Sequence, residues 1–312
     1  MAGFPSFSTL LRDAEQARWS LDEATAGLID LDFSRPLLPE ALVHARALDF
    51  LDDDERLVLN QIRAHAYLGI WSLGERFVLP FVMLEASRSL HRDEEEFLAL
   101  MGVGQQAAKH IVAFTRFAQA CEHGFDAELG IIGPAGDAVA PFLTRDTLAV
   151  GVLVLHLLCT AQPHSLRAMR GAGLMNEPFR RLLQLHWREE CQSVRVLSLV
   201  VGKLAREASR HQRERAFEQY LTMLDEISAS FRPQVRLDLA AFEQSARPLS
   251  EQQREAFLEI QGRSYDELFL RSGLEHPTVR RAIADLLGEA SPALELAAER
   301  FSAVAGSGPG PA

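Results

Sequence analysis

No stretch of the chain alternates apolar and polar residues as a half-buried β-strand does, and hairpin-forming dipeptides are absent. Apolar residues instead recur every three or four positions over four long runs, which is the period of an amphipathic helix. These runs predict helices over about residues 52–90, 93–120, 145–162 and 177–205. The sequence therefore predicts an all-α fold, and four helices of this length are the parts of a four-helix bundle.

Local signals indicate where these helices begin and end. The carboxylates of "DDDE" (52–55) suit a helix N-terminus, because they interact favourably with the helix dipole. Pro80 can kink the first helix, and Pro163 predicts the end of the third. The glutamates at 94–96 are expected to form a solvated first turn. The connection that contains "GIIGPAGDAVAPFLT" (130–144) is long enough for a crossover between the second and third helices.

The chain outside the bundle is also expected to be helical. "SEQQ" (250–253) is a capping box that should start a helix reaching about residue 270, and a short helix over 275–288 should end at Gly288. The expected organisation is an N-terminal segment with short helices, the bundle, helices packed on the bundle and a disordered tail, over residues 1–51, 52–210, 211–304 and 305–312.

Composition narrows the class of protein. The 312 residues carry a formal net charge of -11 without a long basic block, which argues against nucleic acid or an anionic membrane as the main partner. Three cysteines without a C-x-x-C motif exclude a disulfide framework and a thiolate zinc site. The longest apolar run (148–159) is too short to span a bilayer, and no secretory signal is readable. We expect a soluble, cytoplasmic protein.

Several polar side chains fall on apolar helix faces. Glu75 shares a face with Trp71 and Val78, His110 lies on the apolar face of the second helix, and Glu190 follows His186 by one turn. Three helices thus direct metal-binding side chains into an apolar interior, and dimetal sites of helical bundles are built in this way. Simpler explanations stay open, because a lone glutamate can pair with a neighbour such as Arg76 and a core histidine can merely be hydrogen-bonded. Cys191 and Met101 are interpreted as core or helix-surface residues.

Several longer segments resemble a known family. They are "LNQIRAHAYLGIWSLGERFVLPFV", "QQAAKHIVAFTRF", "AQPHSL", "LHWREECQSVRVL" and "QGRSYDELFLRSGLEHP". They are similar in order and spacing to bacterial ferritin-like proteins related to the p-aminobenzoate N-oxygenase type of di-iron oxygenase, over about residues 52–285. The resemblance implies a ferritin-like bundle with additional C-terminal helices.

The resemblance also implies a site with seven ligand positions. Four of them match residues of this chain that can bind a metal, namely Glu75, His110, His186 and Glu190. The other three carry residues that do not match the family pattern, namely Ala107, Leu158 and Ser193. In the family's arrangement Glu75 and His110 would serve one metal and Glu190 would bridge, while the second metal would keep only His186.

Three hypotheses follow. The first is a ferritin-like protein with a degraded dimetal site and no tightly bound metal. It would have a binding or assembly role, as a homodimer or with a partner protein. Ala107 and Leu158 favour this hypothesis, because apolar residues lower the cost of leaving a former metal site empty. The second is a metal-dependent oxidase or oxygenase with one iron, manganese or zinc ion per chain. The third is a di-iron enzyme with ligands from other residues, for which His156 and His164 are poor substitutes.

Overall fold

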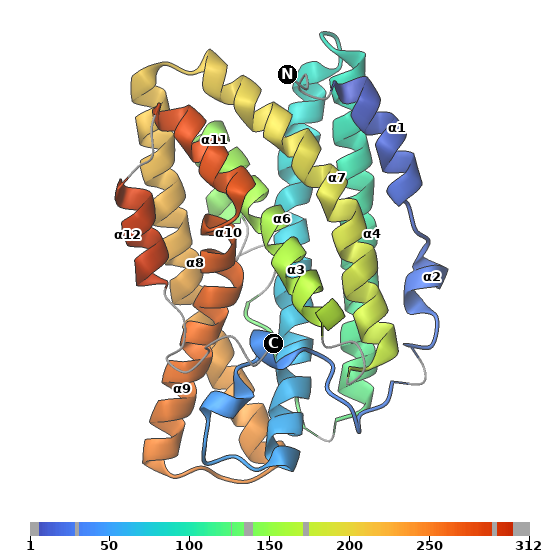
Figure 1. The fold of residues 1–312 in the computed structure, drawn as a ribbon, viewed down its shortest axis with the longest axis vertical. Coiled ribbons are helices and arrows are strands. Elements are labelled where there is room, and N and C mark those ends of the chain that lie inside the picture. Colours follow the sequence, from blue (N-terminus) through green and yellow to red (C-terminus); the bar gives the residue numbers. More distant parts are fainter. Residues whose placement is uncertain are drawn as a thin grey trace.

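The computed structural model describes residues 6–28, 31–125, 127–133, 140–170, 175–288 and 292–301. All regular structure within these residues is helical, and no strand occurs among them. The bundle consists of α3 (Asp53–Ser89), α4 (Glu94–His123), α6 (Thr147–Arg170) and α7 (Glu177–Glu207). Helix α3 packs along α4, and α6 packs along α7 (Figure 1). The predicted all-α fold with a four-helix bundle is confirmed.

Capping residues explain several helix ends. The Asp52 side chain accepts a hydrogen bond from the backbone N–H of Glu55, whose own side chain accepts one from the backbone N–H of Asp52. This capping box starts α3 at the predicted acidic turn. Ser250 starts α9 (Glu251–Asp266) by the same motif. Gly288 ends α11 (Pro277–Leu287) with φ of 82°, a left-handed conformation that favours glycine.

Helix α6 is longer than predicted. Pro163 lies inside it, and the helix continues to Arg170. The reason is tertiary packing: Ser165 and Ala168, both beyond the proline, are buried, and the Ser165 hydroxyl donates to the Leu183 carbonyl of α7 at 3.2 Å. Burial of this last turn against α7 outweighs the local preference for ending a helix at proline.

The first turn of α4 is only partly solvated. Glu94 and Glu95 are exposed as expected, but Glu96 is 2% exposed and pairs with Lys203 of α7 at 2.6 Å. The expectation of a wholly solvated acidic turn was therefore wrong at Glu96. Its position three residues after the Asp93 cap turns it toward α7, where a lysine of the neighbouring helix neutralises it.

The C-terminal part covers one side of the bundle. Helix α8 (Arg210–Ser245) packs on α3 and α6, and α9 packs along α8. The chain then passes through a π-helical segment, η4 (Glu267–Arg271), and α10 (Ser272–Leu274) to α11 and α12 (Pro292–Arg300). Figure 1 shows these elements in orange and red beside α6. The full length of α8 was not delimited from the sequence, and the predicted tail lies outside the described residues.

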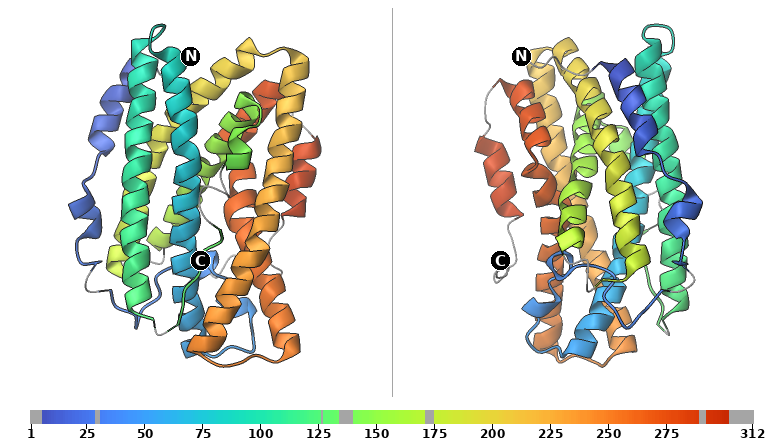
Figure 2. Two further views of the ribbon diagram at one scale, coloured as in Figure 1. Left: turned by 180° about the vertical axis from the view of Figure 1, so that it is seen from behind. Right: turned by 45° about the vertical axis from the view of Figure 1, so that its right-hand side comes forward.

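The N-terminal part covers the opposite side. Helices α1 (Phe7–Ala17) and α2 (Leu21–Thr25) lie against both α4 and α7, as the right-hand view of Figure 2 shows. Two 3₁₀ turns, η2 (Glu40–Leu42) and η3 (Ala45–Ala47), lead from there to α3. The bundle thus lies between an N-terminal and a C-terminal layer.

Two helices, α3 and α6, are long and apolar enough to cross a membrane by composition alone. Both are enclosed by neighbouring helices, and most side chains of α6 are buried. Packing against neighbouring helices of the bundle explains their apolar character.

Candidate metal centre

Four of the predicted ligands meet in the centre of the bundle. Glu75 comes from α3, His110 from α4, and His186 and Glu190 from successive turns of α7. Each is at most 2% exposed. One ligand atom from each of the four lies within 4.8 Å of the others. The predicted proximity of these residues is confirmed, whereas metal binding itself stays a prediction.

The spacing of these atoms suits a single metal ion. Glu75 Oε1 lies 2.9 Å from His110 Nδ1 and 3.3 Å from His186 Nε2. Glu190 Oε1 lies 3.3 Å from His110 Nδ1 and 3.7 Å from His186 Nε2. Ligands held at about 2.0–2.2 Å from a metal are roughly 3.3–3.6 Å apart at tetrahedral corners. The four separations bracket that range, so little movement would be needed to enclose one ion.

Two buried oxygens support the same interpretation. Glu75 Oε2 and Glu190 Oε2 have no hydrogen-bond partner among the described residues. A buried carboxylate oxygen without a partner is costly, and a bound cation removes that cost. Two imidazole nitrogens with two carboxylates are also a ligand set that iron, manganese and zinc accept. The residues present therefore fit one divalent transition-metal ion.

The charge of the centre is set by His110. Burial opposes its charged form, but the carboxylates of Glu75, Glu189 and Glu190 outweigh burial and raise the pKa of His110 well above its ordinary value. Its Nδ1–H donates to Glu75 and its Nε2–H donates to Glu189, each at 2.9 Å. Burial alone would raise the pKa of Glu75, yet His110 and His186 lower it to about 2. His110 and Glu75 thus form a buried imidazolium–carboxylate pair.

His186 and Glu190 favour their neutral forms. Burial lowers the pKa of His186 to about 4, and the charge of His110 acts in the same direction. Burial and the nearby charge of Glu75 raise the pKa of Glu190 to about 7. Without a metal, protons at His110 and Glu190 therefore balance the negative charge of the centre.

Glu189 is a further buried carboxylate of the centre that the sequence did not single out. It is fully buried, accepts from His110 Nε2 and pairs with Lys109 Nζ at 2.5 Å. Its bond to Nε2 fixes the ring so that Nδ1 faces Glu75 and Glu190, as carboxylates do behind many metal-binding histidines. Glu189 directly precedes Glu190, and helical spacing alone could not show that its side chain also reaches His110.

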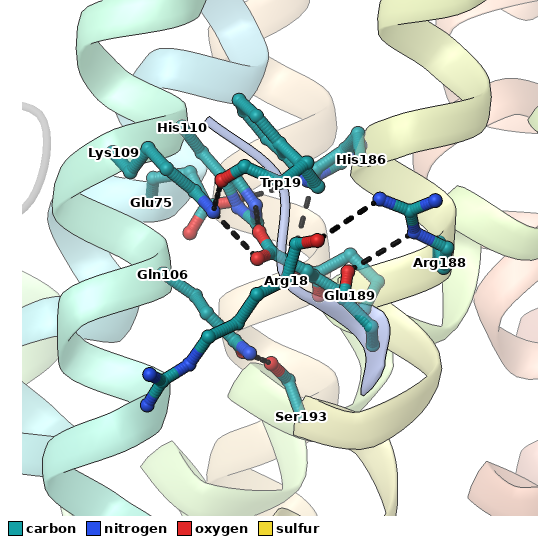
Figure 3. Close-up of polar contacts among 12 residues, drawn as sticks. Arg18, Trp19, Glu75, Gln106, Lys109, His110, His186, Arg188, Glu189 and Ser193 are labelled. Atoms are coloured by element: carbon teal, nitrogen blue, oxygen red, sulfur yellow. Dashed lines mark hydrogen bonds and ion pairs between the residues drawn. The ribbon is translucent and has the colours of Figure 1, made fainter. Parts of the chain in front are cut away.

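The N-terminal segment closes this side of the centre. The Trp19 ring stacks on His110 with centroids 5.6 Å apart, and Lys109 Nζ lies 3.9 Å from the Trp19 ring centre. Lys109 also donates to the Trp19 carbonyl at 2.9 Å, and Arg188 donates to the carbonyls of Ala17 and Arg18. Figure 3 shows Trp19 in front of His110, between Lys109 and His186.

The three positions that do not match the resembled pattern carry no metal-binding side chain in the structure. Ala107 and Leu158 are buried apolar side chains, each 2% exposed. Ser193 donates its hydroxyl to Gln106 at 2.8 Å, so these two polar groups satisfy each other (Figure 3). Gln106 does not occupy a ligand position, as the spacing predicted. These three positions are thus occupied by two apolar side chains and a hydroxyl that is hydrogen-bonded to Gln106.

The two other buried histidines of this region point elsewhere. His156 donates from Nε2 to the Phe269 carbonyl, and His164 donates from Nε2 to the Leu268 carbonyl, both at 2.9 Å. Neither belongs to the metal-capable group, which consists of Glu75, His110, His186 and Glu190. The expectation that they are poor substitute ligands agrees with these contacts. Arg76, the alternative partner for Glu75, is exposed, and the described partners of Glu75 are the histidines.

A small cavity reaches the centre from the side of α11. It measures about 110 Å³ and has Glu190 and Leu158 in its wall. Gln162 and His276, joined by a hydrogen bond of 2.6 Å, form part of its lining, together with the half-buried Cys191. Burial raises the pKa of the Cys191 thiol to about 11, so it remains protonated near neutral pH.

Comparison with known proteins gives only distant likenesses. No family model matches the chain, and no curated protein matches it. A point mutant of an R2-like ligand-binding oxidase with an anaerobically reconstituted Mn/Fe cofactor has 14% identity and a TM-score of 0.46, over 85% of this chain and 95% of that one. Another mutant with an aerobically reconstituted Mn/Fe cofactor has 14% identity and a TM-score of 0.44, over 96% and 94%. Identity at this level transfers neither ligands nor activity.

Proposed function

We propose that this ferritin-like protein binds one divalent transition-metal ion per chain, through Glu75, His110, His186 and Glu190. The observation that carries the proposal is the convergence of four buried ligand atoms from three helices, with two carboxylate oxygens left without partners. Iron and manganese are the preferred ions, because the ligand set contains imidazole and carboxylate without thiolate. A dinuclear centre is not proposed, since the second position lacks ligands.

The surrounding residues would have separate tasks in the bound state. Glu189 would keep the proton on His110 Nε2 and leave Nδ1 free to bind, while Lys109 would offset the charge of Glu189. Glu190 and His110 would lose the protons that they carry without metal, so the centre's total charge would change little on binding. Trp19 would exclude water from the His110 side. Bound iron or manganese would supply Lewis acidity and one-electron redox chemistry.

The resemblance to di-iron oxygenases and the narrow cavity beside Glu190 support a reaction with a small oxidant as the activity of such a centre. Without a bridging carboxylate pair, we propose a mononuclear oxidase or oxygenase rather than the dinuclear chemistry of the family. A cytoplasmic location is proposed with it, because three protonated thiols suit a reducing compartment.

Metal stoichiometry tests the proposal directly. Chelator-treated protein is dialysed anaerobically against Fe²⁺ or Mn²⁺, and bound metal is measured by mass spectrometry alongside the melting temperature. We expect one ion per chain and a higher melting temperature, because a ligand that binds only the folded state stabilises it. Glu75→Gln should weaken binding at least 100-fold, about 2.7 kcal/mol.

Glu85→Gln is the matched control. Glu85 is another buried carboxylate of α3, but it pairs with Arg88 and lies outside the metal-capable group. It should bind metal as the parent does. Two ions per chain in the parent, or equal loss of binding in both variants, would contradict a single site at these residues.

A metal-free binding or assembly role is the second candidate. It is favoured by the hydrogen bonds of His110, both of whose ring nitrogens have carboxylate partners without any metal. In that case the chain would act as a homodimer or with a partner protein. No retained metal and no melting shift with Fe²⁺, Mn²⁺ or Zn²⁺ would support this candidate over the first.

A further inference from the structure

A separate cavity lies on the side of α3 that faces the C-terminal layer. It measures about 330 Å³, opens partly to solvent and is lined by residues of α3, α6, α8, the segment before α6 and the π-helical segment. Four phenylalanine rings form much of its wall: Phe77, Phe142, Phe231 and Phe269. Phe77 and Phe142 meet edge to face at 6.1 Å, and Phe231 lies 5.7 Å from Phe269. None of these residues belongs to the metal-capable group.

The segment 130–132, which contributes Ile132 to the cavity wall, is held in place. Gln234 of α8 is fully buried, accepts from the Ile132 backbone N–H and donates to the Gly130 carbonyl, both at 3.0 Å. Ile131 packs against Gly69 so closely that a Cβ there would lie 2.3 Å from its Cδ1 atom. The cavity wall is thus fixed by tertiary contacts before any ligand arrives.

Gly74 leaves room within the cavity. It is a half-buried helical residue, and a Cβ built on it would meet no atom within 4 Å. Glycine is unfavourable in a helix interior, so a glycine that opens onto a cavity has a cost without a packing benefit. At about 330 Å³ this partly open cavity falls at the lower end of the volumes of small-molecule pockets.

The chemistry of the lining selects the ligand. Among the described residues of the lining, Glu226 alone is charged, and it is paired with Arg145 at 2.6 Å. The Ser230 hydroxyl donates to the carbonyl of Ile227. No unpaired charge among these lining residues could compensate an ionised ligand, whose burial would be costly. An apolar cavity of about 150 Å³ accommodates benzene, so about 330 Å³ suits two rings. Aromatic walls favour an aromatic ligand through offset and edge-to-face contacts.

We propose that this cavity is a binding site for an uncharged two-ring aromatic molecule, independent of the metal centre. The site is preformed, because its walls belong to helices and to the anchored segment 130–132. Binding should therefore require little rearrangement and leave the ligand's polar group near the Glu226 and Arg145 side chains.

Titration calorimetry with two matched probes tests the proposal. 2-Naphthol and 2-naphthalenesulfonate share a ring system and differ in charge at neutral pH. With a chelator present, so that the metal centre plays no part, we expect saturable binding of one 2-naphthol per chain. The sulfonate should bind at least ten-fold more weakly. Failure of the parent protein to bind 2-naphthol saturably, or equal binding of the sulfonate, would overturn the proposal.

Filling the cavity tests its location. Gly74→Leu should weaken 2-naphthol binding at least ten-fold, and Gly262→Leu should leave it unchanged. Gly262 is also a half-buried helical glycine with free space for a Cβ, but it lies on α9 outside this lining. Ser230→Leu narrows the cavity from the side of α8. If circular dichroism shows Gly74→Leu to be unfolded, 2-naphthol binding is measured with Ser230→Leu instead, and it should likewise be weakened. Undiminished binding by a folded filling variant would place the 2-naphthol elsewhere and overturn the proposal.

Discussion

His110 and His164 are equally buried histidines of one helical bundle, and their surroundings give them opposite protonation. His110 faces the carboxylates of Glu75 and Glu189, which raise its pKa well above the ordinary value. His164 faces the Leu268 carbonyl and the Tyr67 hydroxyl, and burial lowers its pKa to about 3. Burial in itself therefore does not identify a metal ligand; the charge and number of acceptors around the ring do.

His156 resembles His164 in its hydrogen bonds and in the direction of its pKa shift. It donates to the Phe269 carbonyl and contacts the Tyr220 hydroxyl at 2.7 Å, and burial lowers its pKa to about 4. Leu268 and Phe269 are successive residues of the π-helical segment. The two histidines thus bind consecutive carbonyls where the regular helical pattern changes, and their role is structural. Gly273 lies against His156, because a Cβ at this position would lie only 2.4 Å from His156 Nε2.

Rebuilding the second metal position gives the largest expected effect. Ala107→Glu, Leu158→Glu and Ser193→His together restore the ligands of the resembled family on faces that already point inward. The metal-free triple variant should lose several kcal/mol of stability, because two new carboxylates are buried together. Fe²⁺ should then bind with two ions per chain and recover that loss. Melting curves with and without anaerobic Fe²⁺ measure both, and an equal gain in the parent would refute the assignment of the three positions.

Lowering the pH should destabilise the fold through His164, which is neutral in the folded protein. The unfolded state protonates His164 near pH 6.5, whereas the folded state resists protonation until about pH 3. The contribution of neutral His164 to stability is complete above pH 6.5 and is lost as the pH falls toward 3, by about 1.4 kcal/mol per pH unit. His164→Gln cannot titrate, so its urea-unfolding free energy should fall less steeply between pH 6.5 and 4.5. Parallel slopes for parent and variant would show that His164 is already charged in the folded protein.

Replacing His164 should lower the free energy of unfolding at neutral pH without changing metal binding. His164→Leu leaves the Leu268 carbonyl and the Tyr67 hydroxyl unpaired in the core, at about 1–3 kcal/mol each. We expect a loss of about 2–6 kcal/mol by urea unfolding, with unchanged metal stoichiometry. Loss of metal binding in a folded His164→Leu protein would contradict the distinction between His110 as a metal ligand and His164 as a structural residue.

The smallest expected effect concerns Glu189. Glu189→Gln keeps an acceptor for His110 Nε2 but removes the charge that orients and supports the ring. Such changes behind a metal-binding histidine cost about 10–100-fold in affinity, or about 1.4–2.7 kcal/mol. Competition with a chromophoric chelator measures this. An unchanged dissociation constant would mean that Glu189 only balances Lys109.

The sequence predicted the bundle because its determinants are local. Apolar periodicity and capping residues, such as Asp52 with Glu55, act within one helix and can be recognised there. The end of α6 was wrong for the opposite reason: the helix passes Pro163 because Ser165 and Ala168 pack on another element. Glu96 was also misjudged, since its partner Lys203 lies more than 100 residues away in the chain.

The centre could be predicted only in part. Glu75, His110, His186 and Glu190 fall on apolar helix faces, which helical spacing indicates. Glu189 and Trp19 could not be found in this way, because their role depends on how α7 and the N-terminal segment meet His110. Spacing alone likewise could not show that Ser193 and Gln106 are hydrogen-bonded to each other.

Trp19 is synthesised long before the surface on which it rests. Ala17 is bound by Arg188, which follows 171 residues later, and translation at about 5–20 residues per second separates the two by roughly 10–30 s. During that interval the Ala17 carbonyl has no arginine partner, since α7 has yet to leave the ribosome. The N-terminal segment therefore cannot complete its docking over the centre before α7 has emerged.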